Sequence, residues 1–343
     1  MKSSVAPQNT PTPAPARRNT MRAIVHEHYG APDLLELRDV EIPVIEDHQL
    51  LVRVHASSVN PADWYGVHGP FFVRIIGREG LRKPKRTTVG SDLAGRVEAV
   101  GKDVKAFRPG DEVFGIGLGA WAEYAVAREP RLARKPLNVS FEEAAAVPIA
   151  ALTALQALRD HGRVQPGQKV LINGASGGVG TYAVQLAKTF GVEVTGVCST
   201  RNVELVRSLG ADSVVDYTQE DFTRRSERFD VMLDVAGSRS FREFRRVLTP
   251  DATVVAVGAP MSARALGPLK HVVGTRLTSL GRSQSVVNFI AKITKEDLEV
   301  MRQHLEAGTV KSVIDRRYEL SQVAEALDYL GTTHARGKVI ITM

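Results

Sequence analysis

The sequence predicts an α/β fold with two lobes, one of which is a doubly wound parallel sheet. The chain has 343 residues, more than one ordinary domain usually holds. Between about residues 147 and 282, short apolar runs alternate with helical patterns, as in a parallel sheet whose strands are joined by helices. Between about 21 and 130, short alternating strands are separated by turn residues instead, which indicates a compact β lobe.

In the β lobe, alternating polarity predicts strands over residues 49–55 and 89–101. A Pro-Gly turn in 108–115 precedes the next strand, and 121–126 continues the meander. The period then changes. Ser140 and Glu143 have the spacing of a capping box, which predicts a helix start, and 149–158 reads as a second helix.

The remaining elements set the expected boundaries. The parallel sheet is predicted to contain strands at 170–172, 192–197, 213–215, 231–234 and 253–257. A polar helix follows at about 295–307, and a terminal strand at 338–342 is free to rejoin the β lobe. We therefore expect a disordered tail over 1–20, a catalytic β lobe over 21–146 that is completed by 283–343, and a dinucleotide-binding domain over 147–282.

Composition excludes several classes of function. The formal net charge is +7, but three of the positive residues lie in the first eighteen and the rest are dispersed. The tight basic cluster at 82–86 has no interleaved aromatic residues, so we expect no nucleic-acid partner. No stretch approaches the roughly 20 apolar residues of a membrane span. Residues 1–20 lack the apolar core of a secretory signal, and Cys198 is the only cysteine, which suits a cytoplasmic protein.

A glycine-rich turn carries the strongest functional signal. The apolar run 170–172 is followed by glycines at 174, 177 and 180 and then by an amphipathic helical pattern. This is a one-residue-longer variant of the Rossmann dinucleotide motif. Gly174 permits the tight turn, Gly177 lets backbone N–H groups approach a pyrophosphate, and Gly180 permits close packing of helix on strand. The predicted contacts of this turn are Gly174, Ser176, Gly177, Gly178, Val179 and Gly180.

The end of the second strand favours NADPH over NADH. An acidic residue there selects a bare ribose 2′-hydroxyl, and a basic one accepts a 2′-phosphate. After Cys198 no carboxylate occurs before Glu204, whereas Arg201 offers a forked array of donors. Ser199 and Thr200 add neutral donors, and Tyr217, after the next strand, is a further candidate. The alternative is that Arg201 is merely an exposed residue of the first helical turn.

Metal ligands are not indicated by spacing. None of the nine histidines lies in a tight ligand pattern, and one cysteine cannot form a four-cysteine zinc site. Zinc held by distant residues stays open on spacing alone.

Four segments together resemble the medium-chain dehydrogenase/reductase superfamily, within its zinc-free quinone-oxidoreductase-like branch. They are ASSVNPADW at 56–64, RPGDEV at 108–113, NGASGGVG at 173–180 and HARGKV at 334–339. The resemblance covers about residue 21 to the C-terminus. It implies a GroES-like β lobe, a Rossmann lobe, a cleft between them and hydride transfer. Zinc-dependent members carry ligands at the positions of Asn60 and Ser91, so the resemblance implies a site without metal.

The resemblance also implies roles for single residues. Asn60 corresponds to a pocket asparagine whose amide would donate to a substrate carbonyl, and Asp63 to an acidic residue that orients it. Tyr65 carries a transferable proton and is a candidate acid, as is His68; Tyr65 might equally be a pocket wall. The residues expected near the cofactor are Thr153, Gly237, Val257, Gly258, Arg336 and Lys338.

Three functions follow as hypotheses. The leading one is an NADPH-dependent reductase of a quinone or an α,β-unsaturated carbonyl compound. The second is metal-free alcohol/carbonyl interconversion, and the third is an NADPH-binding sensor or interaction protein with little catalysis. An insertion at 71–86 is expected to border the cleft and to affect the choice of a small-molecule substrate. The apolar strand candidate at 271–277 corresponds to a segment that pairs across a dimer interface in relatives, so the resemblance implies a homodimer. Such an edge strand either finds a partner or must be covered.

Overall fold

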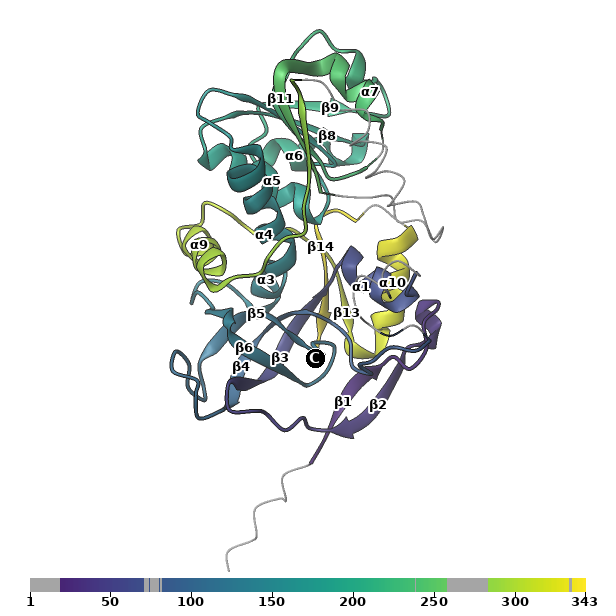
Figure 1. Cartoon of the computed structure of the whole chain (residues 1–343), viewed down its shortest axis with the longest axis vertical. Helices are drawn as coiled ribbons and strands as arrows, with labels where there is room; N and C mark the ends of the chain where they lie inside the picture. Colours follow the sequence, from purple (N-terminus) through teal and green to yellow (C-terminus); the bar gives the residue numbers. More distant parts are fainter. Residues whose placement is uncertain are drawn as a thin grey trace, which may run out of the picture.

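The chain folds into two lobes stacked along its longest axis (Figure 1). This is a computed structural model that describes residues 19–70, 74, 80, 82–237, 239–257, 283–332 and 335–343. The upper lobe in the figure contains a parallel sheet, and the lower lobe a mainly antiparallel one in which the two strands nearest the C-terminus pair in parallel. The α/β class predicted from the alternation of strands and helices is confirmed.

The upper sheet has six parallel strands in the order β12-β11-β10-β7-β8-β9. Renumbered along the chain from β7, this is the Rossmann order, with β7 and β10 on either side of the point where the winding reverses. Ligands of such sheets bind at the carboxyl ends of the strands beside that point. The strands are β7 (Lys169–Asn173), β8 (Glu193–Cys198), β9 (Ser213–Asp216), β10 (Phe229–Asp234), β11 (Leu248–Ala256) and β12 (Ser285–Asn288).

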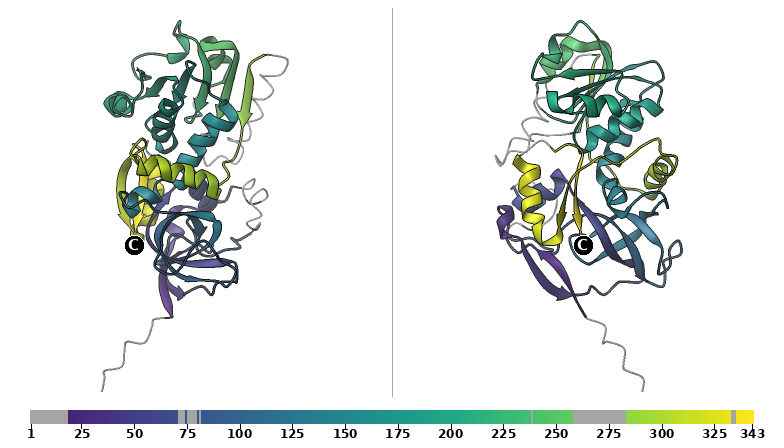
Figure 2. Two further views of the ribbon diagram at one scale, coloured as in Figure 1. Left: turned by 90° about the vertical axis from the view of Figure 1, so that its left-hand side faces the viewer. Right: turned by 180° about the vertical axis from the view of Figure 1, so that it is seen from behind.

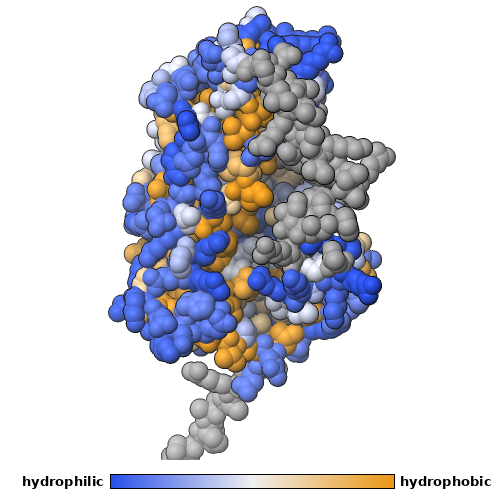
Figure 3. All heavy atoms as spheres, in the orientation of Figure 1, coloured by the Kyte–Doolittle hydropathy of each residue, from blue (hydrophilic) through white to orange (hydrophobic). Residues whose placement is uncertain are grey.

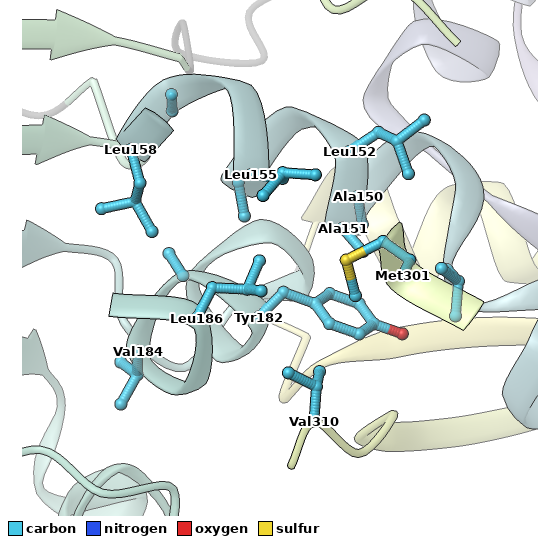
Figure 4. Close-up of a cluster of buried hydrophobic side chains, with 14 of the residues drawn as sticks. Ala150, Ala151, Leu152, Leu155, Leu158, Tyr182, Val184, Leu186, Met301 and Val310 are labelled. Carbon is cyan, nitrogen blue, oxygen red and sulfur yellow. The ribbon is translucent and has the colours of Figure 1, made fainter. Parts of the chain in front are cut away.

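Several helices of the upper lobe pack around one hydrophobic core, and α7, η4 and η5 pack around a second. The close-up in Figure 4 shows leucines of α4 facing Tyr182 and Leu186 of α5, with Met301 of α9 closing the cluster. Tyr182 is fully buried, and its hydroxyl group forms a hydrogen bond with Ser312 Oγ at 2.7 Å. The helices are α4 (Pro148–Gln156), the π-helical turn η2 (Ala157–Gly162), α5 (Gly178–Thr189), α6 (Val203–Ser208), α7 (Phe241–Phe244) and α9 (Lys295–Glu306), with one-turn helices at η3 (Thr200–Asn202), η4 (Phe222–Arg224) and η5 (Arg245–Val247).

The lower sheet runs β13-β14-β3-β4-β5-β6, and a further β3–β6 pairing closes four of its strands into a small barrel. The terminal strand β14 pairs antiparallel with β3, so the chain does return to this lobe at its end. The strands are β3 (Gln49–Val59), β4 (Asp92–Val100), β5 (Glu112–Leu118), β6 (Tyr124–Arg134), β13 (Ile314–Glu319) and β14 (Lys338–Thr342).

Smaller elements cover the lower sheet. Strands β1 (Thr20–Val25) and β2 (Glu36–Glu41) form a hairpin at its edge. Helix α1 (Pro61–His68) lies beside α10 (Val323–Thr332), as the right-hand view of Figure 2 shows. Helix α3 (Phe141–Ala145) begins with the predicted capping box, in which Ser140 Oγ accepts from the Glu143 N–H. Single turns η1 (Pro32–Leu34) and η6 (Leu320–Gln322) complete the lobe.

Several expected boundaries need correction. The dinucleotide-binding domain was expected to end at 282, but β12 at Ser285–Asn288 pairs with β11 in the parallel sheet. Strand β1 starts at Thr20, inside the expected tail. The helix expected over 149–158 ends as an α-helix at Gln156 and continues as a π-turn. Gly258, the strand candidate at 271–277 and most of the insertion at 71–86 lie outside the described residues. No helix in the described ranges has the length and apolarity of a bilayer span.

Candidate active site

The glycine turn between β7 and α5 has the geometry of a phosphate cradle. Gly174 has φ +90°, a conformation that side chains rarely adopt. A Cβ on Gly180 would collide with the carbonyl oxygen of Gly174, so this position needs glycine for packing. A Cβ on Gly177 would meet only Gly174 O, at 3.6 Å, which leaves open space above the first turn of α5. The turn therefore presents backbone N–H groups and a helix N-terminus to the open space, an arrangement that suits a phosphate group.

The chain returns to this turn just before β14. Gly177 and Gly337 form an isolated parallel bridge, and a Cβ on Gly178 would lie 3.1 Å from Lys338 Cδ. Arg336 is exposed, and its backbone N–H donates to Asp315 Oδ2. The phosphate cradle of the upper lobe and the first residue of β14 in the lower lobe thus touch. On the face of the molecule drawn in Figure 3, apolar side chains gather in a band that runs from one lobe to the other.

Lys338 ends in a buried polar cluster of the lower lobe. Its side chain is 3% exposed, and Nζ donates to Asn60 Oδ1 at 2.5 Å and to Val59 O at 3.4 Å. Asp92 Oδ2 lies 3.5 Å from the same nitrogen. Lys338 was expected to bind the cofactor directly. In the structure only its aliphatic part borders the glycine turn, because the ammonium group is held by this cluster.

Asn60 and Asp63 belong to the same cluster. Asn60 Nδ2 donates to Asp92 Oδ2 at 2.9 Å and to Asp63 Oδ2 at 3.3 Å, so both of its amide hydrogens are engaged. Donation to a substrate carbonyl, which was expected of Asn60, would require one of these bonds to break. Asp63 also accepts the backbone N–H of Asn60 at 2.9 Å, which caps α1 and orients that residue as expected.

Asp92 is the central acceptor of the cluster and was missed at the level of sequence. It is fully buried, and its Oδ2 accepts from Ser58 Oγ at 2.6 Å as well as from Asn60. Its Oδ1 accepts the backbone N–H of Ile149 at 3.1 Å, at the start of α4. Asp92 therefore links β3, β4, β14 and the first helix of the upper lobe. The sequence did offer one signal for Asp92: it is a carboxylate at a buried position of the strand predicted over 89–101, and a buried carboxylate needs hydrogen-bond partners.

The cluster perturbs the titration of its members. Burial and the nearby Asp92 carboxylate raise the pKa of Asp63 to about 7, against the stabilising bonds from Asn60. Burial lowers the pKa of the Lys338 ammonium group, although the two carboxylates oppose the shift. Ser91 Oγ, on the partly exposed side, lies 3.4 Å from Asp63 Oδ1. The Asp63 carboxyl group, with a pKa near neutral, therefore lies beside the hydroxyl group of a partly exposed serine.

Tyr65 and Thr153 lie on helices that begin next to this cluster. Tyr65 is partly buried two residues after Asp63, and burial raises the pKa of its hydroxyl group. Its hydroxyl therefore stays protonated at neutral pH. Thr153 Oγ1 donates to Ile149 O at 2.6 Å within α4, one turn from the Ile149 N–H that bonds Asp92. His68, the other acid candidate, stacks on Trp64 with ring centroids 3.7 Å apart.

A second hollow lies at the ends of β8 and β9. Its volume is about 370 Å³, and it is lined by Ser199, Thr200, Arg201, Tyr217 and Thr218. The structure thus brings together all four residues expected around a 2′-phosphate. Thr200 is less suited to that role, because its hydroxyl donates to Asp216 Oδ2 at 2.6 Å.

The ends of β10 and β11 complete the cofactor side. Asp234 Oδ1 accepts from Asn173 Nδ2 at 2.8 Å and from the N–H of Gly237 at 3.0 Å. Gly237 has φ +61°, so it serves a turn that favours glycine. Val257 N donates to Asp234 O at 2.9 Å. Asp234, which was read only as a strand residue, therefore shapes the loop expected to pass the cofactor.

Comparison with known proteins places this geometry in a family. Residues 46–137 match the alcohol dehydrogenase GroES-like domain, and 209–341 match a profile described as zinc-binding dehydrogenase. A tomato (Solanum lycopersicum) 2-methylene-furan-3-one reductase is 35% identical over 337 residues, covering 94% of this chain and 79% of its own. The chain belongs to the medium-chain dehydrogenase/reductase superfamily. Its relatives place it among the quinone-oxidoreductase-like members, as the motifs predicted.

Two further members of this superfamily are similar over most of their length. The NADPH-dependent alkenal/one oxidoreductase of Arabidopsis thaliana is 32% identical, with 94% of this chain and 79% of that protein covered. The solved quinone oxidoreductase from Coxiella burnetii has a TM-score of 0.83 and 29% identity, covering 94% of this chain and 99% of that one. The superfamily binds a nicotinamide cofactor, and the open space at Gly177 beside the N-terminus of α5 fits its pyrophosphate.

Zinc does not fit the corresponding positions here. One of the matching profiles is described as zinc-binding, but the resemblance puts Asn60 and Ser91 at the ligand positions. An amide and a hydroxyl group are poor zinc ligands beside the usual cysteine, histidine and carboxylate. The Lys338 ammonium group lies 2.5 Å from Asn60 Oδ1, where a second cation would be repelled. No group of three or more His, Cys, Asp or Glu residues suited to a metal occurs within the described part of the chain.

Proposed function

We propose that this protein is an NADPH-dependent oxidoreductase that reduces the electron-poor C=C bond of a quinone or an α,β-unsaturated carbonyl compound. The observation that carries the proposal is the contact between the phosphate cradle at Gly178 and Lys338 of the buried cluster. It puts a dinucleotide site and a set of perturbed titratable groups side by side. The names of the tomato and Arabidopsis relatives support the same class of substrate.

NADPH supplies the hydride when it is bound, and the protein supplies the proton and the orientation. Hydride addition to the β-carbon leaves an enolate, which must gain one proton at the α-carbon. We assign that proton to the Asp63 carboxyl group, with the Ser91 hydroxyl as the intermediate donor, because Ser91 Oγ lies 3.4 Å from Asp63 Oδ1 and the pKa of Asp63 is raised to about 7. Tyr65 retains its proton at that pH and is the proposed donor to the carbonyl oxygen.

Asn60, Asp92 and Lys338 have a positioning role in this proposal. Their mutual hydrogen bonds hold Asp63 at the start of α1. Asn60 therefore acts through Asp63, rather than by touching the substrate. Thr153, Gly237, Val257 and Arg336 are proposed to lie along the bound cofactor, as their places at strand and helix ends suggest.

The choice of NADPH over NADH is proposed to rest on Arg201, assisted by Ser199 and Tyr217. Loss of one charge-assisted hydrogen-bond donor weakens binding by about tenfold or more. Arg201→Ala should therefore weaken NADPH binding by about that factor in a fluorescence titration and leave NADH binding within twofold. Equal loss for both cofactors would contradict this assignment.

Steady-state turnover tests the function itself. Purified protein should oxidise NADPH in the presence of quinones and enones, and chelators should not change the rate. Tyr65→Phe and Asp63→Asn should lower kcat much more than they change the affinity for NADPH. Metal-dependent alcohol oxidation that chelators abolish would overturn the proposal. A homodimer and a cytoplasmic location remain part of the proposal and are tested by light scattering and by fractionation of cells.

A further inference from the structure

Asn202 lies between the two phosphate-binding regions and contacts both. It is the last residue of η3 and is 2% exposed, and the sequence analysis did not single it out, although it named the preceding Ser199, Thr200 and Arg201. Its side-chain nitrogen Nδ2 lies 3.0 Å from Ser176 Oγ in the glycine turn and 3.2 Å from Ser199 Oγ in the hollow at the end of β8. One buried amide therefore bridges two serines that are 23 residues apart in the sequence.

The direction of these hydrogen bonds follows from counting donors. With nitrogen toward the serines, Asn202 uses both of its N–H donors and leaves Oδ1 buried without a partner among the described residues. Turned by 180°, the amide would leave two buried N–H donors without a partner in place of one oxygen, which costs more. Asn202 is thus the donor to both serines.

The consequence concerns the serine protons. A hydroxyl oxygen that accepts from Asn202 still carries its own hydrogen, which is free to turn outward. Ser176 and Ser199 are both partly exposed, so each can donate to a ligand oxygen. Thr200 and Thr218 provide the contrast, because their hydroxyl groups donate to the Asp216 carboxylate, at 2.6 and 2.7 Å. An acceptor in place of Asn202 would turn the serine protons inward in the same way.

We propose that Asn202 is a positioning residue that sets Ser176 and Ser199 as donors to the pyrophosphate and to the 2′-phosphate of NADPH. This inference rests on the proposed function, because it takes NADPH as the ligand. The buried Oδ1 fits the assignment, since an unsatisfied acceptor costs stability and is retained where the residue serves a ligand.

Fragments of NADPH test the pyrophosphate site and the 2′-phosphate site separately. ADP-ribose has the pyrophosphate without a 2′-phosphate, and 2′-AMP has the 2′-phosphate without a pyrophosphate. Calorimetry should show that Ser176→Ala weakens the binding of ADP-ribose only, and that Ser199→Ala weakens the binding of 2′-AMP only. Asn202→Ala should weaken both, by about three- to tenfold each, and NADPH by about tenfold or more.

A double-mutant cycle tests whether Asn202 acts through the serines. In the background that lacks both hydroxyl groups, Asn202→Ala should change NADPH affinity by less than twofold. The same loss in both backgrounds, or no loss in either, would overturn the inference. Asn202→Asp, of the same shape, accepts from both serines and adds a negative charge, so it should weaken NADPH more than Asn202→Ala does. If that variant binds NADPH as tightly as the wild type, the inference is again wrong.

The outcome is distinguishable from failure of the proposed function. Wild-type protein that binds neither NADPH nor 2′-AMP would contradict the choice of cofactor. Wild-type protein that prefers NADPH, with Asn202 variants that match it, would contradict only the role of Asn202. Thermal melting of each variant, with Ser208→Ala on the exposed face of α6 as the matched control, reports any general loss of stability.

Discussion

The phosphate cradle and the buried polar cluster touch each other but are built by opposite means. The cradle is one continuous segment, Gly174 to Gly180, and it acts through backbone groups that face open space. The cluster combines side chains from 58–63, from 91–92 and from 338, and its polar groups satisfy one another. A site for the pyrophosphate, a part of the cofactor that does not change, can be built from one open segment. A site that holds a proton must exclude water, which takes residues from several strands.

The largest effect is expected from removing the central acceptor of the cluster. Asp92→Ala leaves Lys338, Asn60 and Ser58 without their shared partner, and breaking a buried ion pair in this way costs about 3–5 kcal/mol. Urea unfolding measures the loss. The control is Glu204→Ala, which breaks an exposed pair with Arg207 and should cost under about 1 kcal/mol. Similar losses for the two variants would mean that the cluster is not stabilising.

The next effect compares two glycines within the cradle. Gly180→Ala forces a Cβ against Gly174 O and should destabilise the protein by about 1–3 kcal/mol. Gly177→Ala has only an ordinary 3.6 Å contact and a φ of −81°, so its melting temperature should stay near that of the wild type. Its NADPH affinity should fall, because the methyl group enters the space assigned to the pyrophosphate. If Gly177→Ala left the affinity for NADPH unchanged, the pyrophosphate would not bind at this position.

The pH dependence of stability sharpens the description of the cluster. The pKa of Asp63 is about 7 in the folded protein and near 3.8 in the unfolded chain, so the folded state binds more protons between these values. The contribution of Asp63 to the free energy of unfolding therefore falls as the pH rises from about 4 to 7. Asp63→Asn should remove that slope in urea titrations. A variant that keeps the wild-type slope would place the titrating group elsewhere.

The smallest effect is expected at Thr200. Its hydroxyl proton is already donated to Asp216, so Thr200→Val should change NADPH affinity by less than about threefold, against tenfold or more for Arg201→Ala. Fluorescence titration of the two variants makes the comparison. A loss at Thr200 equal to that at Arg201 would show that the threonine turns toward the ligand.

Local patterns predicted the cradle well and the cluster poorly. The glycine spacing, the strand before it and the helix after it define Gly174, Gly177 and Gly180 without tertiary information. Strand β12 was missed as part of the parallel sheet, because the strand-helix alternation was taken to end at about residue 282, just before Ser285–Asn288. Asp92 was quoted only as part of a motif, since its partners Lys338 and Ile149 are 246 and 57 residues away. Asn202 likewise gains its meaning only when Ser176 and Ser199 are neighbours in space.

The most direct test of the central claim follows the hydride. One turnover with an enone and NADPH that carries deuterium at the transferable position should give a saturated ketone with deuterium on the β-carbon, seen by proton NMR and mass spectrometry. The α-carbon should carry hydrogen from solvent, delivered through Asp63. An allylic alcohol with deuterium on the carbinol carbon, or no consumption of NADPH across quinones and enones, would contradict the account.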